Sequence, residues 1–172
     1  MKKSVMTAAA VIVIVVIAAV GVGVYLATQG GGGGGGGTKN TYTVANATSL
    51  QMEANVTSQG VTITQKWAAK NLNTSQLMLR LDLLGGTAGN YSYILNASNQ
   101  TAWSAENGVW TDVSSTFNDL WNIWGTHWTN LRNALANWSG TGDYTYTAST
   151  GESVRVYNIS LNPSLADSLF QP

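Results

Sequence analysis

The chain has 172 residues, carries eight Lys or Arg against eight Asp or Glu, and contains no cysteine. The missing cysteine excludes disulfides, thiolate catalysis and Cys-based metal sites. Only 9% of the residues are charged, against a typical ~25%, so Ser, Thr, Asn and Gln must supply most of the surface polarity. No basic patch stands out, which argues against nucleic acid as a partner.

Residues 1–28 combine two early lysines with a long apolar run. Lys2 and Lys3 precede a stretch from Ser4 to Thr28 that contains no charged residue. About 22 apolar residues, at ~1.5 Å per residue in a helix, cover the ~30 Å hydrocarbon core of a bilayer. Because lysines favour the cytoplasmic side, we expect a single-pass anchor in the cell membrane with the C-terminal domain extracellular.

Two other interpretations of this segment stay open. A cleaved signal peptide usually has an apolar region of only about 7–15 residues and a small-residue cleavage site, and no such site stands out here. A pilin-type N-terminal helix would be cut near the lysines and packed in a filament core, but no clear processing site follows Lys3. The retained anchor is the interpretation that we favour.

Eight consecutive glycines, Gly30–Gly37, dominate residues 29–40. Gly-rich sequence behaves as a flexible coil, and a linker of this length has an r.m.s. span of ~20 Å. We therefore expect a tether that joins the anchor to an outward-facing domain formed by residues 41–172.

The acceptor motif for N-glycosylation, Asn-x-Ser/Thr, is about twice as frequent in this domain as chance would give. Together with the predicted export, this density predicts a glycosylated surface protein. Glycans would also keep a weakly charged surface soluble. The dense sequons and absent cysteine suit an archaeal cell surface. The motif begins at Asn46, Asn55, Asn73, Asn90, Asn96, Asn99, Asn137 and Asn158.

Alternation with a period of two predicts strands over most of the domain. Residues 77–83 place leucine at every second position, and residues 61–67 alternate in the same way. The Asn107-Gly108 pair predicts a tight hairpin turn that brings Trp103 and Trp110 near each other. A second hairpin is predicted around residues 149–152. Sequential short strands with tight connections indicate an antiparallel meander.

One helical segment interrupts the strands. Thr116 with Asp119 resembles a capping box, and Gly140 is placed to end the helix. Gly125 and Thr126 predict a kink or two shorter helices. A helix face with this many aromatic residues must be buried against a large apolar surface. We expect that surface to be the concave face of the sheet. The apolar residues at helical spacing are Phe117, Trp121, Trp124, Trp128, Leu131, Leu135 and Trp138.

The residues that usually carry catalysis are sparse. His127 is the only histidine, and we interpret it as a solvent-facing helix position or a cap. Asp112 and Asp119 flank the predicted helix start, where carboxylates favour the positive end of the helix dipole. No catalytic constellation stands out, so we predict no enzyme, no cofactor and no metal site.

The tryptophans are the remaining candidates for a functional site. Trp121, Trp124 and Trp128 of the helix, together with Trp103 and Trp110 of the hairpin, are predicted to line an apolar pocket. Indole rings contact both an apolar ligand and a polar rim, which suits a lipid-like ligand. The alternative interpretation is a hydrophobic core, since a helix on a sheet needs such a face.

Three segments, 69–84, 91–113 and 154–172, resemble the LolA/LppX-type lipoprotein carriers. Residues 107–110, Asn-Gly-Val-Trp, occupy the place of a tryptophan-containing hairpin in that family. Residues 162–170 occupy the place of its ending, an Asn, a small linker and a Leu-Phe tail. The resemblance covers nearly all of residues 41–172.

The resemblance implies an α+β fold in which a curved antiparallel half-barrel embraces the helix, and a non-enzymatic protein that binds acyl or isoprenoid chains. The chain departs from the family because it lacks a lipobox cysteine and because a permanent tether forbids shuttling between two membranes. A tethered version can still hold, present or extract a lipid. The alternative is a structural cell-surface protein, a surface-layer accessory or a pilin-like filament subunit with surface-layer or filament partners.

Overall fold

The computed structural model describes residues 43–85 and 89–172. The predicted anchor at 1–28 and the predicted linker at 29–40 lie outside the described residues. Across the part of the chain that is described, none of the helices has the length and apolar character needed to span a bilayer.

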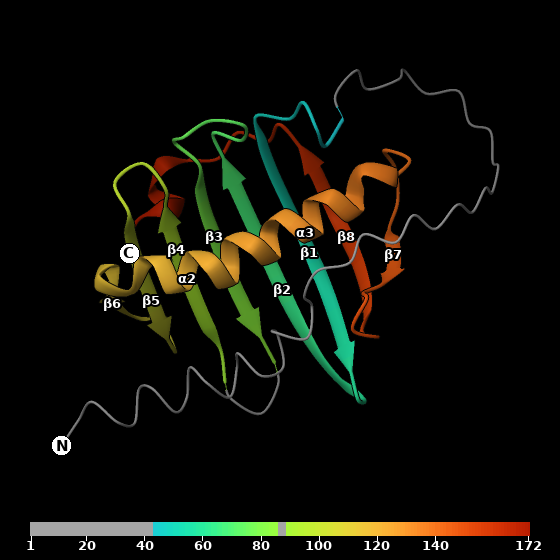
Figure 1. Cartoon of the computed structure of the whole chain (residues 1–172), viewed down its shortest axis with the longest axis horizontal. Helices are drawn as coiled ribbons and strands as arrows, with labels where there is room; N and C mark the ends of the chain where they lie inside the picture. The colour runs from blue at the N-terminus through green and yellow to red at the C-terminus, as the bar shows by residue number, and fades with distance from the viewer. Residues whose placement is uncertain (1–42, 86–88) are drawn as a thin grey trace.

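Eight antiparallel strands form one sheet, in the order β6-β5-β4-β3-β2-β1-β8-β7. The first six strands make the expected meander, and β8 then pairs with β1 while β7 takes the far edge (Figure 1). The sheet is curved and does not close into a barrel. The strands are β1 (Ser49–Ser58), β2 (Val61–Lys70), β3 (Met78–Leu84), β4 (Tyr91–Asn96), β5 (Thr101–Glu106), β6 (Val109–Asp112), β7 (Tyr144–Thr147) and β8 (Ser153–Leu161).

The predicted alternation places apolar side chains on one face of the sheet. In β3, Leu79, Leu81 and Leu83 are buried, whereas the residues between them are half-buried. The hairpin turn between β5 and β6 is also as predicted, because Asn107 and Gly108 both adopt positive φ, at 50° and 83°. A two-residue turn of this kind matches the twist of the flanking strands.

A single helical segment of about 24 residues connects β6 to β7 and crosses the sheet (Figure 1). At ~1.5 Å per residue it is ~36 Å long, and eight strands spaced by ~4.8 Å are ~34 Å wide. The helix is therefore just long enough to carry the chain from one edge of the sheet to the other. Its parts are η2 (Ser114–Thr116), α2 (Phe117–Leu120), η3 (Trp121–Gly125), α3 (Thr126–Ala134) and η4 (Leu135–Asn137).

The predicted capping box at the helix start is wrong. The hydroxyl of Thr116 donates to the carbonyl of Val113 (2.9 Å) and makes no cap bond to the helix. The helical segment begins at Ser114, three residues before Phe117, where the Asp112 carboxylate accepts from the backbone N–H of Ser114 (2.8 Å) and from its hydroxyl (2.6 Å). These two bonds lower the pKa of Asp112, and they fix the turn from β6 into the helix.

The predicted break near Gly125 and Thr126 takes another form. The chain stays helical, and Trp121–Gly125 forms a short π-helical segment. A side chain at Gly125 would place its Cβ 3.1 Å from the indole of Trp121. Glycine thus lets this indole lie against the helix. The chain passes the poor helix-forming residues Gly125 and Thr126 with a wider π-helical turn, which ends at Gly125, and not with a break.

The main core lies between the helix and the inner face of the sheet. Leu50, Met52 and Ala54 of β1 and Leu131 and Leu135 of the helical segment are almost fully buried there. The prediction of an α+β fold with an antiparallel sheet packed against one tryptophan-rich helix is confirmed.

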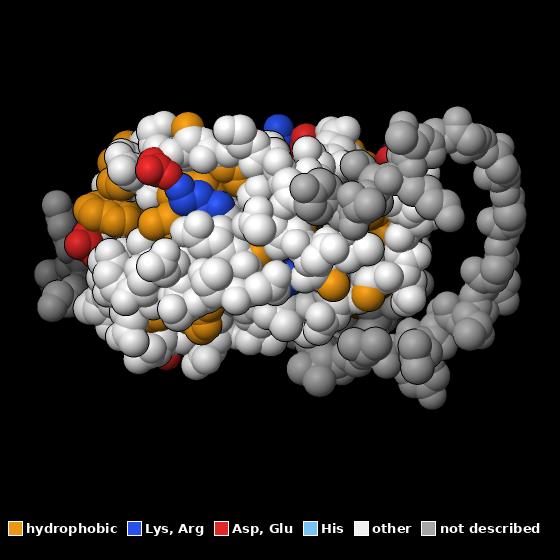
Figure 2. Space-filling model, turned by 90° about the horizontal axis from the view of Figure 1, so that it is seen from above, with side chains coloured by type: hydrophobic (Ala, Val, Ile, Leu, Met, Phe, Trp, Pro, Cys, Tyr) orange, Lys and Arg blue, Asp and Glu red, His pale blue; other side chains and the backbone are white. Residues whose placement is uncertain are grey.

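A second apolar cluster covers part of the outer face of the sheet. It forms where η5 (Asp167–Phe170), near the C-terminus, packs Phe170 against Ala68 and Ile94. Lys70 pairs with Asp167, and the ammonium of Lys70 also lies over the Phe170 ring. Figure 2 shows hydrophobic side chains gathered at this end of the molecule beside basic and acidic groups.

Candidate functional site

The five tryptophans predicted to line one pocket are divided between the two faces of the sheet. Trp121, Trp124 and Trp128 belong to the main core under the helix. Trp103 and Trp110 pack in the second cluster on the outer face. The hairpin prediction correctly placed these two together, but their strand positions point them away from the helix.

Pairing register explains this division. Trp103 stands opposite Asp112, and Ala105 stands opposite Trp110, so both tryptophans share a face. Trp103 also stands opposite Ile94, which belongs to the outer cluster. Because side chains alternate along a strand, a single position decides which face a residue occupies.

The helix tryptophans are packed against aromatic side chains of the sheet. Trp124 is 1% exposed and Trp128 is 2% exposed. The ring of Trp124 lies 5.1 Å from Tyr93, and that of Trp128 lies 5.6 Å from Trp67. These side chains form the core itself, so a ligand can reach them only when the helix moves away from the sheet.

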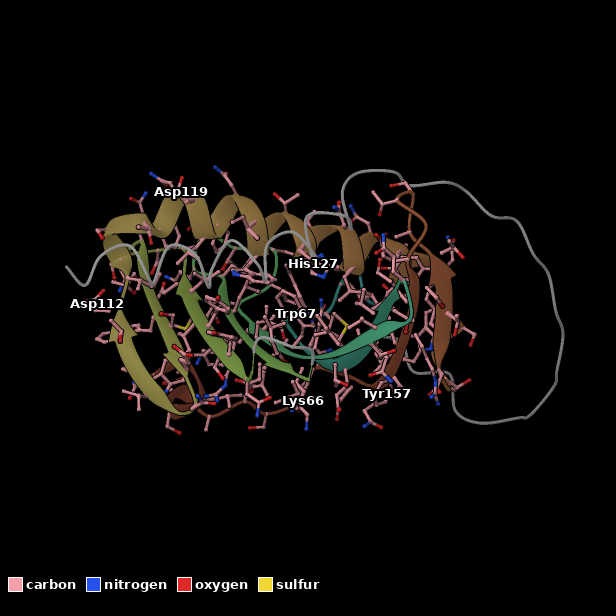
Figure 3. All side chains as sticks on the ribbon, turned by 90° about the horizontal axis from the view of Figure 1, so that it is seen from below. Lys66, Trp67, Asp112, Asp119, His127 and Tyr157 are labelled. Atoms are coloured by element: carbon pink, nitrogen blue, oxygen red, sulfur yellow. The ribbon has the colours of Figure 1, made fainter. Side chains whose placement is uncertain are left out.

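A buried polar group lies in the middle of this core, and the sequence interpretation did not include it. Gln65 of β2 is 0% exposed. Its Oε1 accepts a hydrogen bond from Trp67 Nε1 (3.1 Å) and lies 2.9 Å from His127 Nε2. Figure 3 places Trp67 and His127 between the sheet and the helix, with Lys66 and Tyr157 on the opposite side of the sheet.

The interpretation of His127 as a solvent-facing residue is wrong. His127 is 5% exposed, and its ring stacks on Trp67 at 5.7 Å. It lies three residues after Trp124 and four before Leu131, so the buried stripe of the helix is wide enough to include it. Burial lowers the pKa of His127 from 6.5 to about 4, which keeps the imidazole neutral.

Two amide donors near His127 lack an acceptor. Trp67 Nε1 can only donate, so the Gln65 oxygen must face it and the Gln65 Nε2 group must face away. Among the described residues, Gln65 Nε2 is buried without a hydrogen-bond partner, and so is Asn130 Nδ2. Asn130 follows His127 by three residues, which makes the two side chains neighbours on the helix.

The surroundings of Gln65 are apolar and uncharged. Across the sheet it stands opposite Ala54 of β1 and Leu83 of β3, and along β2 the same face continues with Ile63 and Trp67. One sequence signal marked the site, because Gln65 is a polar residue at an inward position of an alternating strand. That it meets His127 could not be read from the sequence.

The outer face carries a different kind of surface. A depression of about 310 Å³ lies over β1, β2 and β8, and its lining residues are Gln51, Met52, Glu53, Lys66, Trp67 and Asn158. Lys66 approaches Glu53 at 3.9 Å, and the Asn158 amide donates to Glu53 (3.0 Å). Its polar groups already bind one another, so this surface is a poor site for an apolar ligand.

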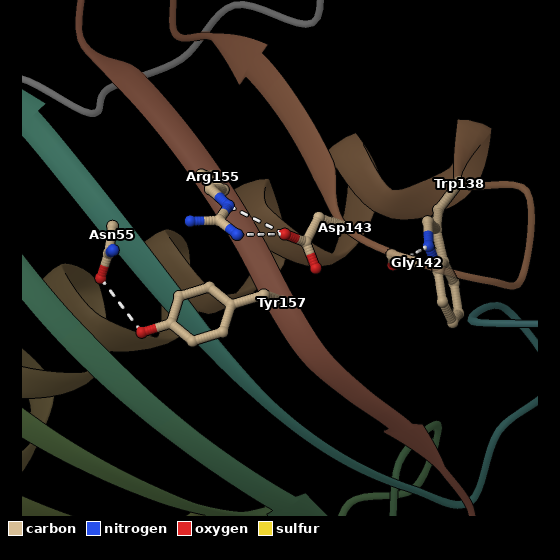
Figure 4. Close-up of polar contacts among 6 residues, drawn as sticks. All are labelled: Asn55, Trp138, Gly142, Asp143, Arg155 and Tyr157. Atoms are coloured by element: carbon tan, nitrogen blue, oxygen red, sulfur yellow. Dashed lines mark hydrogen bonds and ion pairs between the residues drawn. The ribbon is translucent and has the colours of Figure 1, made fainter.

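Further polar pairs extend this face toward the β7 edge. Tyr157 donates to Asn55 (3.2 Å), and the Arg155 guanidinium binds Asp143 through Nε (2.8 Å) and Nη2 (2.5 Å) (Figure 4). Partial burial, followed by the nearby Glu53 carboxylate, raises the pKa of Tyr157. These contacts pair the polar side chains of this face with one another.

No sequon asparagine is buried, and all eight lie in the described residues. Asn55 and Asn96 are half-buried, and the other six are exposed. In Asn73 and Asn158 the Nδ2 group, to which a glycan would be attached, donates a hydrogen bond. Asn73 donates from Nδ2 to the Ala45 carbonyl (3.1 Å), and Asn158 donates from Nδ2 to Glu53.

Glycan occupancy is expected to follow this difference. In a host that glycosylates Asn-x-Ser/Thr, we expect high occupancy at Asn90, Asn99 and Asn137 and low occupancy at Asn73 and Asn158, whose Nδ2 groups are engaged in the folded chain. Glycopeptide mass spectrometry of the full-length protein measures each site. Equal occupancy at all five sites would contradict the expectation.

Metal binding and similarity to known proteins add no further candidate. No group of three or more His, Asp or Glu side chains within the described residues is placed to hold a metal ion. Comparisons of the chain with protein-family models, curated proteins and solved structures gave no match. The resemblance to the LolA/LppX-type carriers therefore stays a prediction.

Proposed function

We propose that this protein is a membrane-anchored, N-glycosylated extracellular protein that binds a lipid or another hydrophobic ligand between its helix and its sheet, without catalysis. One observation supports this most strongly: a tryptophan-rich helix crosses an unclosed sheet over an apolar core cluster, and buried amide donors beside it have no partner among the described residues. A purely structural core has no need of such donors, because each unpaired buried amide costs free energy.

The contacts of the helix are consistent with a helix that can move away from the sheet to admit a ligand. Among the described residues, side-chain contacts hold the helix to the sheet. Arg132 attaches the helix to two neighbouring loops, donating to the carbonyls of Val44 (3.2 Å) and Ala45 (3.0 Å) and to the Asn73 side chain (2.8 Å). Burial lowers the pKa of Arg132. Breaking these bonds would lower the barrier to lifting the C-terminal half of the helix, which the packing of Leu131 and Leu135 against the sheet still opposes.

Quenching of tryptophan fluorescence tests the proposal. All seven tryptophans lie between residues 67 and 138, so emission reports on the domain and not on the predicted anchor. The full-length chain in lipid nanodiscs is titrated with the methyl ester of dibrominated stearic acid, since bromine quenches tryptophan only near contact. We expect the quenching to saturate as probe is added. Quenching that only increases in proportion to the probe content of the bilayer would contradict the proposal.

The same measurement tests whether the helix opens. Arg132→Met keeps most of the apolar stem but removes the bonds to Val44, Ala45 and Asn73, so we expect the probe to enter several-fold faster. Arg155→Met on the outer face, which removes the pair with Asp143, is the matched control and should leave the rate unchanged. Equal uptake rates in the wild type and in Arg132→Met would contradict an opening helix.

The alternative proposal is a structural surface-layer or filament subunit. Within residues 43–85 and 89–172 the sheet ends at β6 and β7, and copies of the chain could pair through these two edges. Each edge strand has only four residues, and short edge strands are typical of proteins that avoid edge-to-edge association. Concentration-dependent assembly without probe binding would favour this alternative.

A further inference from the structure

We propose that Gln65 and Asn130 form a neutral anchor that binds a carbonyl oxygen of the ligand, so that the preferred ligand is an uncharged acyl ester rather than a plain hydrocarbon. This inference rests on the proposed function and specifies which chemical group the interior recognises. Gln65 Nε2 is the decisive atom, because it is buried, offers two N–H donors and has no acceptor among the described residues.

The hydrogen bonds around Gln65 fix the direction of this donor. Its Oε1 already accepts from the indole N–H of Trp67 at 3.1 Å and lies 2.9 Å from His127 Nε2. A neutral His127 that keeps its proton on Nε2 donates to the same oxygen. Both acceptor positions are then used, and only the Nε2 end is left to face a ligand.

The chemistry of the partner follows from the surroundings. A donor needs an acceptor, and the neighbours Ile63, Ala54 and Leu83 offer only apolar side chains. A phosphate or carboxylate would bring a negative charge into this face with no cation beside it, at a large desolvation cost. A carbonyl oxygen supplies the acceptor without a charge, and the attached chain is suited to the tryptophan-lined core.

Asn130 extends the anchor along the helix. Its Nδ2 is buried without a partner and lies one turn beyond His127. When the helix lifts and a ligand enters, a donor on the sheet and a donor on the helix would border the same apolar space. A ligand carbonyl would thus satisfy groups that stay unpaired in the closed protein.

Two probes of equal chain length test the anchor with the full-length protein in nanodiscs. They are the methyl ester of dibrominated stearic acid and a dibrominated octadecane, which differ in the ester group. The wild type is expected to bind the ester about tenfold more tightly. Gln65→Leu should abolish this preference, whereas Gln51→Leu, on the exposed outer face of β1, should preserve it.

Infrared spectroscopy gives a readout that does not depend on a variant. Because Gln65→Leu also removes the acceptor for Trp67 and His127, near-ultraviolet circular dichroism must first show that it folds. With the wild type, a carbon-13 label in the ester carbonyl reports its hydrogen bonding directly. We expect the bound carbonyl band at lower wavenumber than that of the probe in hydrocarbon solvent.

The outcomes separate this inference from the proposed function. A lost ester preference in Gln65→Leu, or a shifted carbonyl band in the wild type, supports the anchor. Equal binding of both probes to the wild type, or an unshifted band on binding, overturns the anchor while hydrophobic binding stands. Failure of both probes to bind overturns the anchor and the proposed function together.

Discussion

Replacing Trp128 with alanine is expected to lower the free energy of unfolding by about 3–5 kcal/mol. Trp128 is 2% exposed and packs its ring 5.6 Å from that of Trp67. The truncation leaves a cavity under the helix that the strands cannot fill, because hydrogen-bonded ladders hold their backbones. Chemical denaturation of the full-length chain in mild detergent, followed by near-ultraviolet circular dichroism, measures the loss.

Trp138→Ala is the matched control for this prediction. Trp138 follows the same helical segment but is half-buried, and its indole N–H donates to the carbonyl of Gly142 (2.9 Å) (Figure 4). Losing this bond and a smaller contact area should cost only about 1–2 kcal/mol. If both variants lose the same stability, Trp128 is not the central packing element that the geometry indicates.

Acidification from about pH 7.5 to about pH 5 is expected to lower the free energy of unfolding by about 2 kcal/mol through His127 alone. Burial holds the pKa of folded His127 at about 4, whereas the ordinary value is 6.5. Between these values the unfolded chain binds a proton that the folded chain does not, so protonation favours unfolding. The stabilising effect is therefore complete above about pH 6.5 and is lost as the pH falls toward 4.

Because His127 is the only histidine, a change of stability between about pH 7.5 and about pH 5 can be assigned to it. The groups that face His127 are Gln65, Trp67 and Trp124, and none carries a charge. His127→Gln keeps a donor for Gln65 and removes the titration, so its stability should be nearly flat between about pH 7.5 and about pH 5. A slope that persists in His127→Gln would show that other groups cause the acid sensitivity.

Local signals predicted most of the elements correctly. Alternation of apolar and polar residues marked β2 and β3, and the Asn107-Gly108 pair marked the turn between β5 and β6. The apolar period marked the helix from Phe117, where α2 begins, but it missed the 3-10 turn that starts three residues earlier at Ser114. The turn was missed because Asp112, at the end of β6, accepts from the Ser114 N–H outside the expected motif.

The candidate site was predictable only in part. The burial of Trp124 and Trp128 against the sheet followed from the width of the apolar stripe. The inclusion of Trp103 and Trp110 did not hold, because the face of a strand residue depends on register with its neighbours. Gln65 is polar at an inward position, a signal that the sequence interpretation did not use, and no local pattern connects it to His127, which is 62 residues away.

Composition and periodicity were enough to establish an α+β domain, its meander and a helix that must bury an aromatic face, because these depend on contacts between residues near in the chain. Strand order at the β8 and β7 edge, the division of tryptophans between two faces and the meeting of Gln65 with His127 were decided only by the tertiary structure. Each depends on how distant strands and the helix are placed in register, and register is set by the packing of the whole sheet.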